Sequence, residues 1–379
     1  MKKLLTIAKD ASIKVSSQIT NYLEPTYIYL PITEEILQDV EIKKVKKGEK
    51  LYEINGKNIY SSVSGRIVGI LKNGKNQYLE IKNDYKEEDL YKGMHEFTTV
   101  NIKTNFAQKI KENSSFDTQE FQNKKRLVLN GIEDEPYIAN RPFMHKHETT
   151  AILQMLDCLA ETYHIPEIRI YLKENDRESI EAFEECIGTY PNITISILPD
   201  YYPIGNEKIL REYLKLTNDT VILKTETVVD LYLNTIRERQ KDVTYVTITG
   251  NAIKNPQVFR VKIGTRANEL IQNYIEFKEK DYKIFLNGIM NRQEIQIENI
   301  VITEEVRAIY FMKPLTYHPK KCIHCGKCDE VCPRKCHPYL AVQTKGAYPN
   351  NDCIHCGLCT FICPSFIDLN EFLKKRSEE

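Results

Sequence analysis

The chain of 379 residues has no tryptophan, no apolar run long enough to cross a membrane, and no excess of either charge. Lys and Arg number 53, and Asp and Glu also number 53, so the charge balance indicates neither a global nucleic-acid binder nor a membrane-surface binder. A membrane-spanning helix needs about 18 or more apolar residues in a row, and no such run occurs. The N-terminal segment begins like a signal peptide, but Lys9 and Asp10 interrupt it, and we expect no export signal.

Glycine and proline are also scarce, with 15 of each, whereas hydrophobic residues make up 41% of the chain. This composition argues against disorder and favours packed cores. At roughly 100–200 residues per domain, the length predicts two to four domains. Eleven cysteines without an export signal indicate a reducing, cytoplasmic location, where cysteine clusters bind metal or carry out redox chemistry more often than they form disulfides.

Nine of the eleven cysteines lie between Cys322 and Cys363. Residues 322–333 read CIHCGKCDEVCP and residues 353–364 read CIHCGLCTFICP, two copies offset by 31 residues (353 − 322). The shared spacing C-x2-C-x2-C-x3-C-P is typical of proteins with two [4Fe–4S] clusters, in which the fourth cysteine of each copy binds the other cluster. We therefore predict these ligand sets: Cys322, Cys325, Cys328 and Cys363 for cluster 1, and Cys353, Cys356, Cys359 and Cys332 for cluster 2.

Two alternatives to this interpretation concern metal type and role. A pair of structural zinc sites could use His324 and His355, but zinc needs only four ligands and has no use for the repeated C-x3-C-P tail. The clusters could also merely brace the C-terminal fold. The remaining cysteines, Cys336, Cys158 and Cys186, are expected to be packing thiols that act as small hydrophobic residues.

The patterning predicts a multi-domain protein of α/β and α+β class. Residues 1–98 are strand-rich and resemble a lipoyl-type barrel-sandwich hybrid, although no lysine stands in a clear lipoylation hairpin. In residues 99–240 strands and helices alternate, which predicts a βαβ domain with a parallel sheet. The expected strands are residues 126–129, 167–172 and 192–198, and the expected helices are residues 147–163, 178–186, 207–216 and 225–239. Residues 241–315 fit a β-grasp module, and residues 316–379 fit a helical ferredoxin-like domain with two clusters. Residues 69–76 nearly match a phosphate-binding loop, but Asn76 replaces its Ser or Thr and no helix is expected to follow.

Three further stretches, together with the cysteine pair, carry a resemblance to a known family. They are residues 130–137 (NGIEDEPY), 202–208 (YPIGNEK) and 249–256 (TGNAIKNP). Their order resembles the C subunit of Rnf-type membrane electron-transport complexes and the related electron-transfer protein of clostridial proline reductase. The central domain also resembles the flavin- and NADH-binding subunit of respiratory complex I, and the third stretch resembles the start of the family's β-grasp module of the soluble-ligand-binding type.

The resemblance implies an FMN and NADH site, but this chain departs from the family pattern there. The family's glycine-rich loop precedes the first stretch, whereas here no glycine occurs between Gly93 and Gly131, and residues 113–120 read NSSFDTQE. A phosphate cradle needs backbone N–H groups that glycines allow to converge, and side chains such as Phe116 and Glu120 would obstruct it. Asn206 replaces the second glycine of the second stretch. The nucleotide site is therefore expected to be degenerate, and binding of FMN and NADH is doubtful.

Glu133 and Glu135 remain candidates for a vestigial flavin site. The favoured alternative is that Glu135 braces the turn before Pro136.

We predict an iron–sulfur electron-transfer protein that relays single electrons through its two clusters to or from a partner oxidoreductase, without NADH oxidation of its own. It would be an electron-transfer subunit rather than a stand-alone enzyme, with protein redox partners that include membrane-complex subunits, and without nucleic acid. Any association with the inner face of the membrane would come through those subunits. The alternative is an NADH- or FMN-dependent dehydrogenase subunit of an Rnf-type or proline-reductase-type system, which NADH-driven cluster reduction would reveal.

Overall fold

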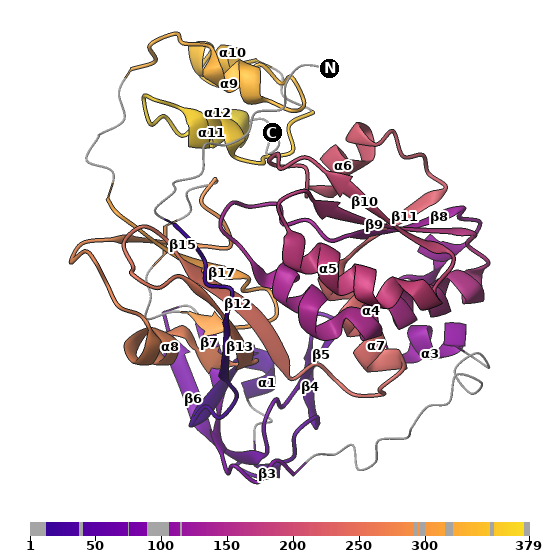
Figure 1. Cartoon of the computed structure of the whole chain (residues 1–379). Helices are drawn as coiled ribbons and strands as arrows, with labels where there is room; N and C mark the ends of the chain where they lie inside the picture. Colours follow the sequence, from indigo (N-terminus) through magenta and orange to yellow (C-terminus); the bar gives the residue numbers. More distant parts are fainter. Residues whose placement is uncertain are drawn as a thin grey trace.

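The computed structural model describes residues 13–37, 41–74, 76–88, 106–113, 116–290, 294–295, 300–314, 321–348 and 352–374. Two β-rich sheets and an α/β sandwich form the body of the molecule, and a small helical unit at the C-terminal end lies on top of it (Figure 1).

The first β-rich part contains an antiparallel sheet of four strands in the order β2-β7-β6-β3 and a separate hairpin, β4-β5. Its elements are β2 (Tyr27–Ile32), α1 (Glu34–Leu37), β3 (Lys44–Val45), β4 (Lys50–Ile54), β5 (Lys57–Tyr60), β6 (Gly65–Asn73) and β7 (Asn76–Asn83). Alternate side chains such as Ile28, Leu30, Leu79 and Ile81 point into one buried core, as a sheet covered on one face requires. The near-match to a phosphate-binding loop, residues 69–76, falls on the ends of β6 and β7, and residue 75 within it lies outside the described residues.

A second sheet of five strands follows the order β1-β13-β12-β17-β15. Its elements, with the short β14–β16 pair and one helix, are β1 (Ile19–Tyr22), β12 (Val243–Thr249), β13 (Gln257–Lys262), β14 (Thr265–Arg266), α8 (Ala267–Tyr274), β15 (Lys283–Leu286), β16 (Val301–Ile302) and β17 (Ala308–Met312). Strand β1 comes from the N-terminal segment and pairs in parallel with β13, with Ile19 opposite Val258. Strand β1 therefore lies before the predicted boundary at residue 98 but belongs to the five-stranded sheet, whose other strands come from residues 243–312.

The central part is an α/β sandwich around a parallel sheet of four strands, β10-β9-β8-β11, which confirms the predicted parallel sheet. Its elements are α3 (Phe106–Asn113), β8 (Arg126–Asn130), α4 (Asn140–Tyr163), β9 (Glu167–Lys173), α5 (Arg177–Cys186), β10 (Ile193–Leu198), α6 (Glu207–Tyr213), β11 (Thr220–Lys224) and α7 (Thr225–Thr235), with 3-10 turns at Thr118–Phe121 and Ile187–Thr189. Leu127 and Leu129 face the core beneath α4, α5 and α7, whereas Val128 faces the opposite core beneath α6. Strand β11 was not expected from the sequence, and α4 begins seven residues earlier than its predicted start at residue 147 (147 − 140).

The C-terminal unit consists of four short helices in two equivalent pairs: α9 (Lys327–Val331), α10 (Pro338–Gln343), α11 (Leu358–Ile362) and α12 (Leu369–Lys374). The second pair repeats the first after 31 residues (358 − 327 and 369 − 338). The backbone repeats as well, because Gly326 and Gly357 precede α9 and α11 with φ of 71° and 76°. None of the helices in the described part of the chain is long and apolar enough to span a bilayer.

Candidate metal centre

The structure gathers the eight motif cysteines around two separate cavities in the C-terminal unit. One cavity is lined by a foursome that combines both sequence copies: Cys322, Cys325, Cys328 and Cys363. The other is lined by the complementary foursome: Cys353, Cys356, Cys359 and Cys332. We call these the first and the second cavity. The two foursomes are the predicted ligand sets, and the last cysteine of each copy lies in the cavity of the other copy.

Backbone N–H groups donate to several of these sulfurs, as in the surroundings of iron–sulfur clusters. The amide of His324 donates to Sγ of Cys322, and the amide of His355 donates to Sγ of Cys353, both at 3.4 Å. Both histidines have positive φ, 58° and 52°, which turns their amides back toward the first cysteine of each copy. Four thiols around one cavity with amide donors to their sulfurs form a donor set that fits a [4Fe–4S] cluster.

The three cysteines outside the motif have different surroundings. Cys336 is buried and lines the second cavity beside the four predicted ligands, so it is not remote from the centre. The C-P-R-K-C sequence places it four residues after Cys332, and this short spacing was the only hint of its position. Cys158 is buried on α4, and Cys186 is half-buried at the end of α5 against the same core.

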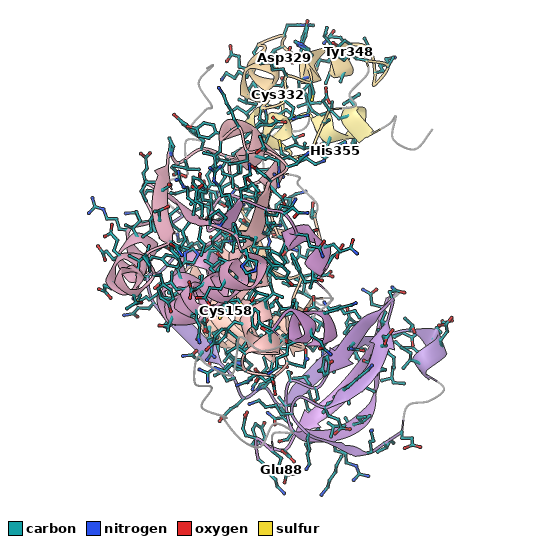
Figure 2. The ribbon with its side chains drawn as sticks, turned by 90° about the vertical axis from the view of Figure 1, so that its right-hand side faces the viewer. Glu88, Cys158, Asp329, Cys332, Tyr348 and His355 are labelled. Carbon is teal, nitrogen blue, oxygen red and sulfur yellow. The ribbon has the colours of Figure 1, made fainter. Side chains whose placement is uncertain are left out.

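The second cavity lies toward the body of the molecule, and the first faces away from it. Leu358, at the start of α11, and Cys356 share a buried apolar cluster with Tyr202 and Met290 of the body. In contrast, Cys325 is exposed, and 61% of the neighbouring Ile323 is exposed. Figure 2 shows Cys332 and His355 at one end of the molecule, with Cys158 in the central part.

Charge also connects this unit to the body. Arg334, which lines the second cavity, forms an ion pair with Glu212 on α6 and donates from Nε to the carbonyl oxygen of Asp352 at 3.2 Å. Among the described residues, apolar packing and the ion pair of Arg334 with Glu212 therefore join the C-terminal unit to the body.

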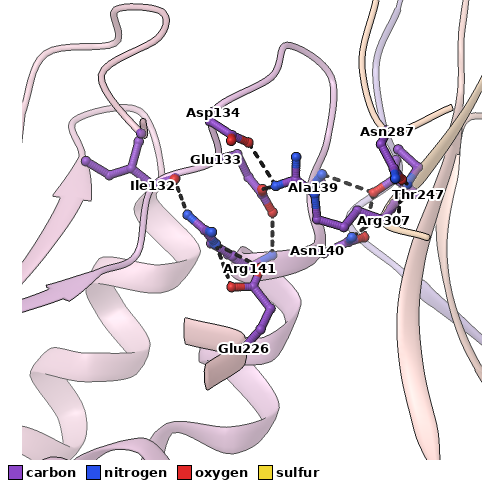
Figure 3. Close-up of polar contacts among 12 residues, drawn as sticks. Ile132, Glu133, Asp134, Ala139, Asn140, Arg141, Glu226, Thr247, Asn287 and Arg307 are labelled. Atoms are coloured by element: carbon purple, nitrogen blue, oxygen red, sulfur yellow. Dashed lines mark hydrogen bonds and ion pairs between the residues drawn. The ribbon is translucent and has the colours of Figure 1, made fainter. Parts of the chain in front are cut away.

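Glu133 lies at the carboxyl end of β8 in a buried polar network with two arginines (Figure 3). Its Oε1 accepts the backbone N–H of Arg141 at 3.0 Å, and its Oε2 lies 3.8 Å from Nη1 of Arg307. The Arg141 side chain is 1% exposed; it donates to both carboxylate oxygens of Glu226, at 3.0 and 3.2 Å, and to the carbonyl oxygen of Ile132. The sequence offered no signal for either arginine, because the carboxylates of Glu226 and Asp134, with which Arg141 and Arg307 pair, lie 85 and 173 residues away in the chain.

The network divides its negative charge unevenly. Burial raises the pKa of Glu133, and the opposing charge of Arg141 does not fully offset this effect. Burial also acts on Glu226, but there the Arg141 guanidinium outweighs it and the pKa is lowered. Asp134 likewise has a lowered pKa because its contact with Arg307, at 2.8 Å, outweighs its burial. The arginines therefore neutralise a cluster of carboxylates within the protein itself.

Unlike Glu133, Glu135 points away from the two arginines and toward the loop that follows β15 of the five-stranded sheet. Its Oε2 accepts the backbone N–H groups of Ile289 and Met290, at 3.2 and 3.3 Å. A Cβ on Gly288 would come within 2.4 Å of the Glu135 carboxyl carbon, so only glycine leaves room for this side chain. Burial raises the pKa of Glu135 to about 8. These contacts agree with a bracing role.

Two of the sequence stretches that carry the family resemblance, residues 130–137 and 202–208, meet in space. Nδ2 of Asn130 donates to the carbonyl oxygen of Gly205 at 2.8 Å, and a Cβ on Gly205 would lie 2.5 Å from the carbonyl oxygen of Ile132. The hydroxyl of Tyr310 donates to the carbonyl oxygen of Pro136 at 2.7 Å, which joins the third module to the same loop.

The segment in place of the glycine-rich loop is only partly described, because residues 114 and 115 lie outside the described ranges. Phe116 stacks on Phe121 at 5.1 Å between ring centroids, and Asp117 caps the turn Thr118–Phe121 by accepting the N–H of Gln119 at 2.9 Å. The described residues thus form a packed turn.

Comparisons with known proteins agree with these features. Residues 101–234 match the sequence profile of the Nuo51 FMN-binding domain, and residues 314–370 match that of the 4Fe-4S dicluster domain. The chain is 27% identical, over 220 residues, to the C subunit of the Na(+)-translocating ferredoxin:NAD(+) oxidoreductase complex of Acetobacterium woodii, and this match covers 55% of the chain and 50% of the relative. It is 26% identical over 223 residues to the C subunit of the ion-translocating oxidoreductase complex of Rhodobacter capsulatus, covering 55% and 43%.

The chain spans about half the length of the curated relatives it matches. Among solved structures, the H2-reduced NAD+-reducing [NiFe]-hydrogenase is similar with a TM-score of 0.45 and 12% identity, covering 72% of this chain and 57% of that one. The predicted resemblance to the Rnf-type C subunit and the predicted dicluster domain are confirmed by these matches.

Proposed function

We propose that this chain, a relative of the C subunits of ion-translocating oxidoreductase complexes with a 4Fe-4S dicluster domain, relays single electrons between protein partners. One observation carries the proposal: each cavity is lined by three cysteines of one copy and the last cysteine of the other. Cluster 1 would take the first foursome as ligands and cluster 2 the second. When bound, the clusters supply one-electron transfer without making or breaking bonds in the protein.

The cavities suggest an order along the relay. Cluster 2 would be the inner one, because Cys356 packs beside Tyr202 and Met290. Cluster 1 would be the outer one, because Cys325 and Ile323 are exposed. An exposed cluster can approach a redox partner closely, so we place partner docking at the outer face. The partners would be other subunits of an Rnf-type complex at the inner, cytoplasmic face of the membrane.

We further propose that the chain does not oxidise NADH. The match to an FMN-binding domain supports an inherited scaffold of that fold. Backbone N–H groups of the protein itself donate to Glu135 and to one carboxylate oxygen of Glu133. The described part of the segment that replaces the glycine-rich loop carries Phe116 in a packed turn. The four units predicted from the sequence, a barrel-sandwich hybrid (1–98), an α/β domain (99–240), a β-grasp module (241–315) and a ferredoxin-like domain (316–379), would then serve mainly to present the clusters.

The alternative is a dehydrogenase subunit that uses FMN and NADH in a non-standard site. The observation in its favour is the sequence match to the FMN-binding domain over residues 101–234.

An anaerobic titration separates the two functions. The protein with its clusters is mixed with NADH, and the visible absorbance of the clusters is followed; dithionite is added afterwards as the positive control. We expect no bleaching by NADH and full bleaching by dithionite. Bleaching by NADH alone would overturn the relay proposal in favour of the dehydrogenase. The Cys325→Ser variant, which lacks one proposed ligand of cluster 1, shows which part of the absorbance belongs to that cluster.

A further inference from the structure

The two cavities are lined by equivalent positions of the internal repeat, so they can be compared residue by residue. Each of the twelve residues that line the first cavity has an equivalent, 31 positions away, that lines the second. Seven of these pairs are identical, including all four cysteine pairs, and five differ. Since the fold and the ligands repeat, differences between the clusters must come from the five unlike positions and from the surroundings.

One unlike pair places a sulfur-directed donor at a single cavity. Cys336 lines the second cavity, and its equivalent Ile367 (336 + 31) lines the first. The backbone N–H of Cys336 donates to Sγ of Cys332 at 3.3 Å. Its buried side chain lines the same cavity as Cys332 and Cys353. An isoleucine side chain has no donor.

At two of the other positions that differ between the cavities, the polar side chain is engaged by another residue of the protein. The hydroxyl of Tyr339, at the first cavity, lies 2.8 Å from Nδ1 of His324. At the second cavity, the guanidinium of Arg334 is engaged by Glu212 and Asp352, which offset its charge. Cys336 is therefore the unlike residue whose amide contacts a proposed ligand sulfur, that of Cys332, and whose side chain lines the same cavity.

We propose that Cys336 raises the reduction potential of cluster 2 by donating its S–H to the sulfurs of Cys332 and Cys353, without being a ligand itself. A reduced cluster carries one more negative charge than an oxidised one, and this charge spreads onto the ligand sulfurs. A donor to those sulfurs stabilises the reduced form more, and hydrogen bonds to sulfur are a recognised control of cluster potential. In the relay, Cys336 would bias a single electron toward the inner cluster.

This inference rests on the proposed two-cluster function, and a swap of the two unlike residues tests it. Cys336→Ile gives the second cavity the residue of the first, and Ile367→Cys gives the first cavity the residue of the second. Cys336→Ser keeps a donor and serves as the conservative variant. For each protein, iron content is measured first, and the two reduction steps are then followed by electron paramagnetic resonance during a potentiometric titration.

We expect Cys336→Ile to retain all its iron and to move one reduction step to lower potential, with the other unchanged. At a fixed potential the reduced-to-oxidised ratio of that cluster should fall by about tenfold, which corresponds to about 59 mV for one electron. Ile367→Cys should move the other step to higher potential, and Cys336→Ser should remain near the wild type. The swap itself thus assigns each step to its cavity.

Two results would overturn the inference while leaving the relay intact: unchanged steps in both swap variants, or loss of about half the iron in both Cys336→Ile and Cys336→Ser, which would make Cys336 a ligand. If the wild-type protein itself held no [4Fe–4S] cluster, the proposed function would fail, and this inference with it.

Discussion

Removal of Cys363 should abolish the cluster whose other ligands lie in the opposite sequence copy. Cys363 belongs to the second copy but lines the first cavity, with Cys322, Cys325 and Cys328. No fifth cysteine lines that cavity, because Ile367 occupies the place that Cys336 has in the second one. The Cys363→Ser variant therefore has no spare thiol with which to repair the site, which makes it a cleaner test than Cys332→Ser.

The expected magnitude follows from the two foursomes. With two [4Fe–4S] clusters the wild-type chain should hold about eight iron atoms, and Cys363→Ser should hold about four. The three partner thiols of the first cavity should become free to react with iodoacetamide under anaerobic conditions, and mass spectrometry of peptides should locate them. The thiols of the second cavity should stay protected. Cys158→Ser is the matched control, because Cys158 lies on α4 away from both cavities, and it should retain all the iron.

The opposite labelling pattern would refute the reasoning. If Cys363→Ser exposed Cys353, Cys356 and Cys359 and left Cys322 protected, each copy would bind its own cluster. The two copies would then be independent sites, and the lining of the cavities would not reflect the ligand sets.

Three further predictions concern the body of the protein. Arg141→Met should lower the free energy of unfolding by about 3–5 kcal/mol, because it leaves the Glu226 carboxylate without its buried partner; a change below about 1 kcal/mol in urea unfolding followed by circular dichroism would contradict this. Burial and, to a smaller extent, the charge of Arg141 lower the pKa of His145 from 6.5 to about 3. Below pH 6.5 the unfolded chain therefore binds a proton at His145 that the folded chain does not bind, and the free energy of unfolding falls as the pH falls. Between pH 7.5 and 5 the wild type should therefore lose about 2 kcal/mol more than His145→Gln, and equal slopes in thermal unfolding across this range would contradict the assignment. Glu212→Gln should change stability by less than about 1 kcal/mol, because its ion pair with Arg334 is partly exposed, and a larger loss of thermal stability would show that this pair holds the cluster unit in place.

The sequence alone determined the chemistry of the C-terminal unit and much of the central fold. Cysteine spacing is a local property, so the C-x2-C-x2-C-x3-C-P repeat indicated two clusters and the exchange of Cys332 and Cys363. The alternation of strands and helices also follows from the local pattern of hydrophobic residues, and it predicted the parallel sheet that the structure contains. Strand β11 escaped prediction because it is only five residues long and runs directly into α7, so its short apolar run has no clear boundary.

Only the tertiary structure decided the surroundings of the candidate sites. The direction in which Glu133 and Glu135 point depends on Arg141, Arg307 and the amides of Ile289 and Met290, and chain folding brings these together from segments far apart. The addition of β1 to a sheet that begins some 220 residues later is likewise invisible to local patterns. Cys336 read as an ordinary packing thiol in the sequence, and only the repeat in three dimensions showed that it faces the second cavity where Ile367 faces the first. Long-range contacts of this kind cannot be predicted from sequence periodicity, because each of them depends on single residues and not on a repeating pattern.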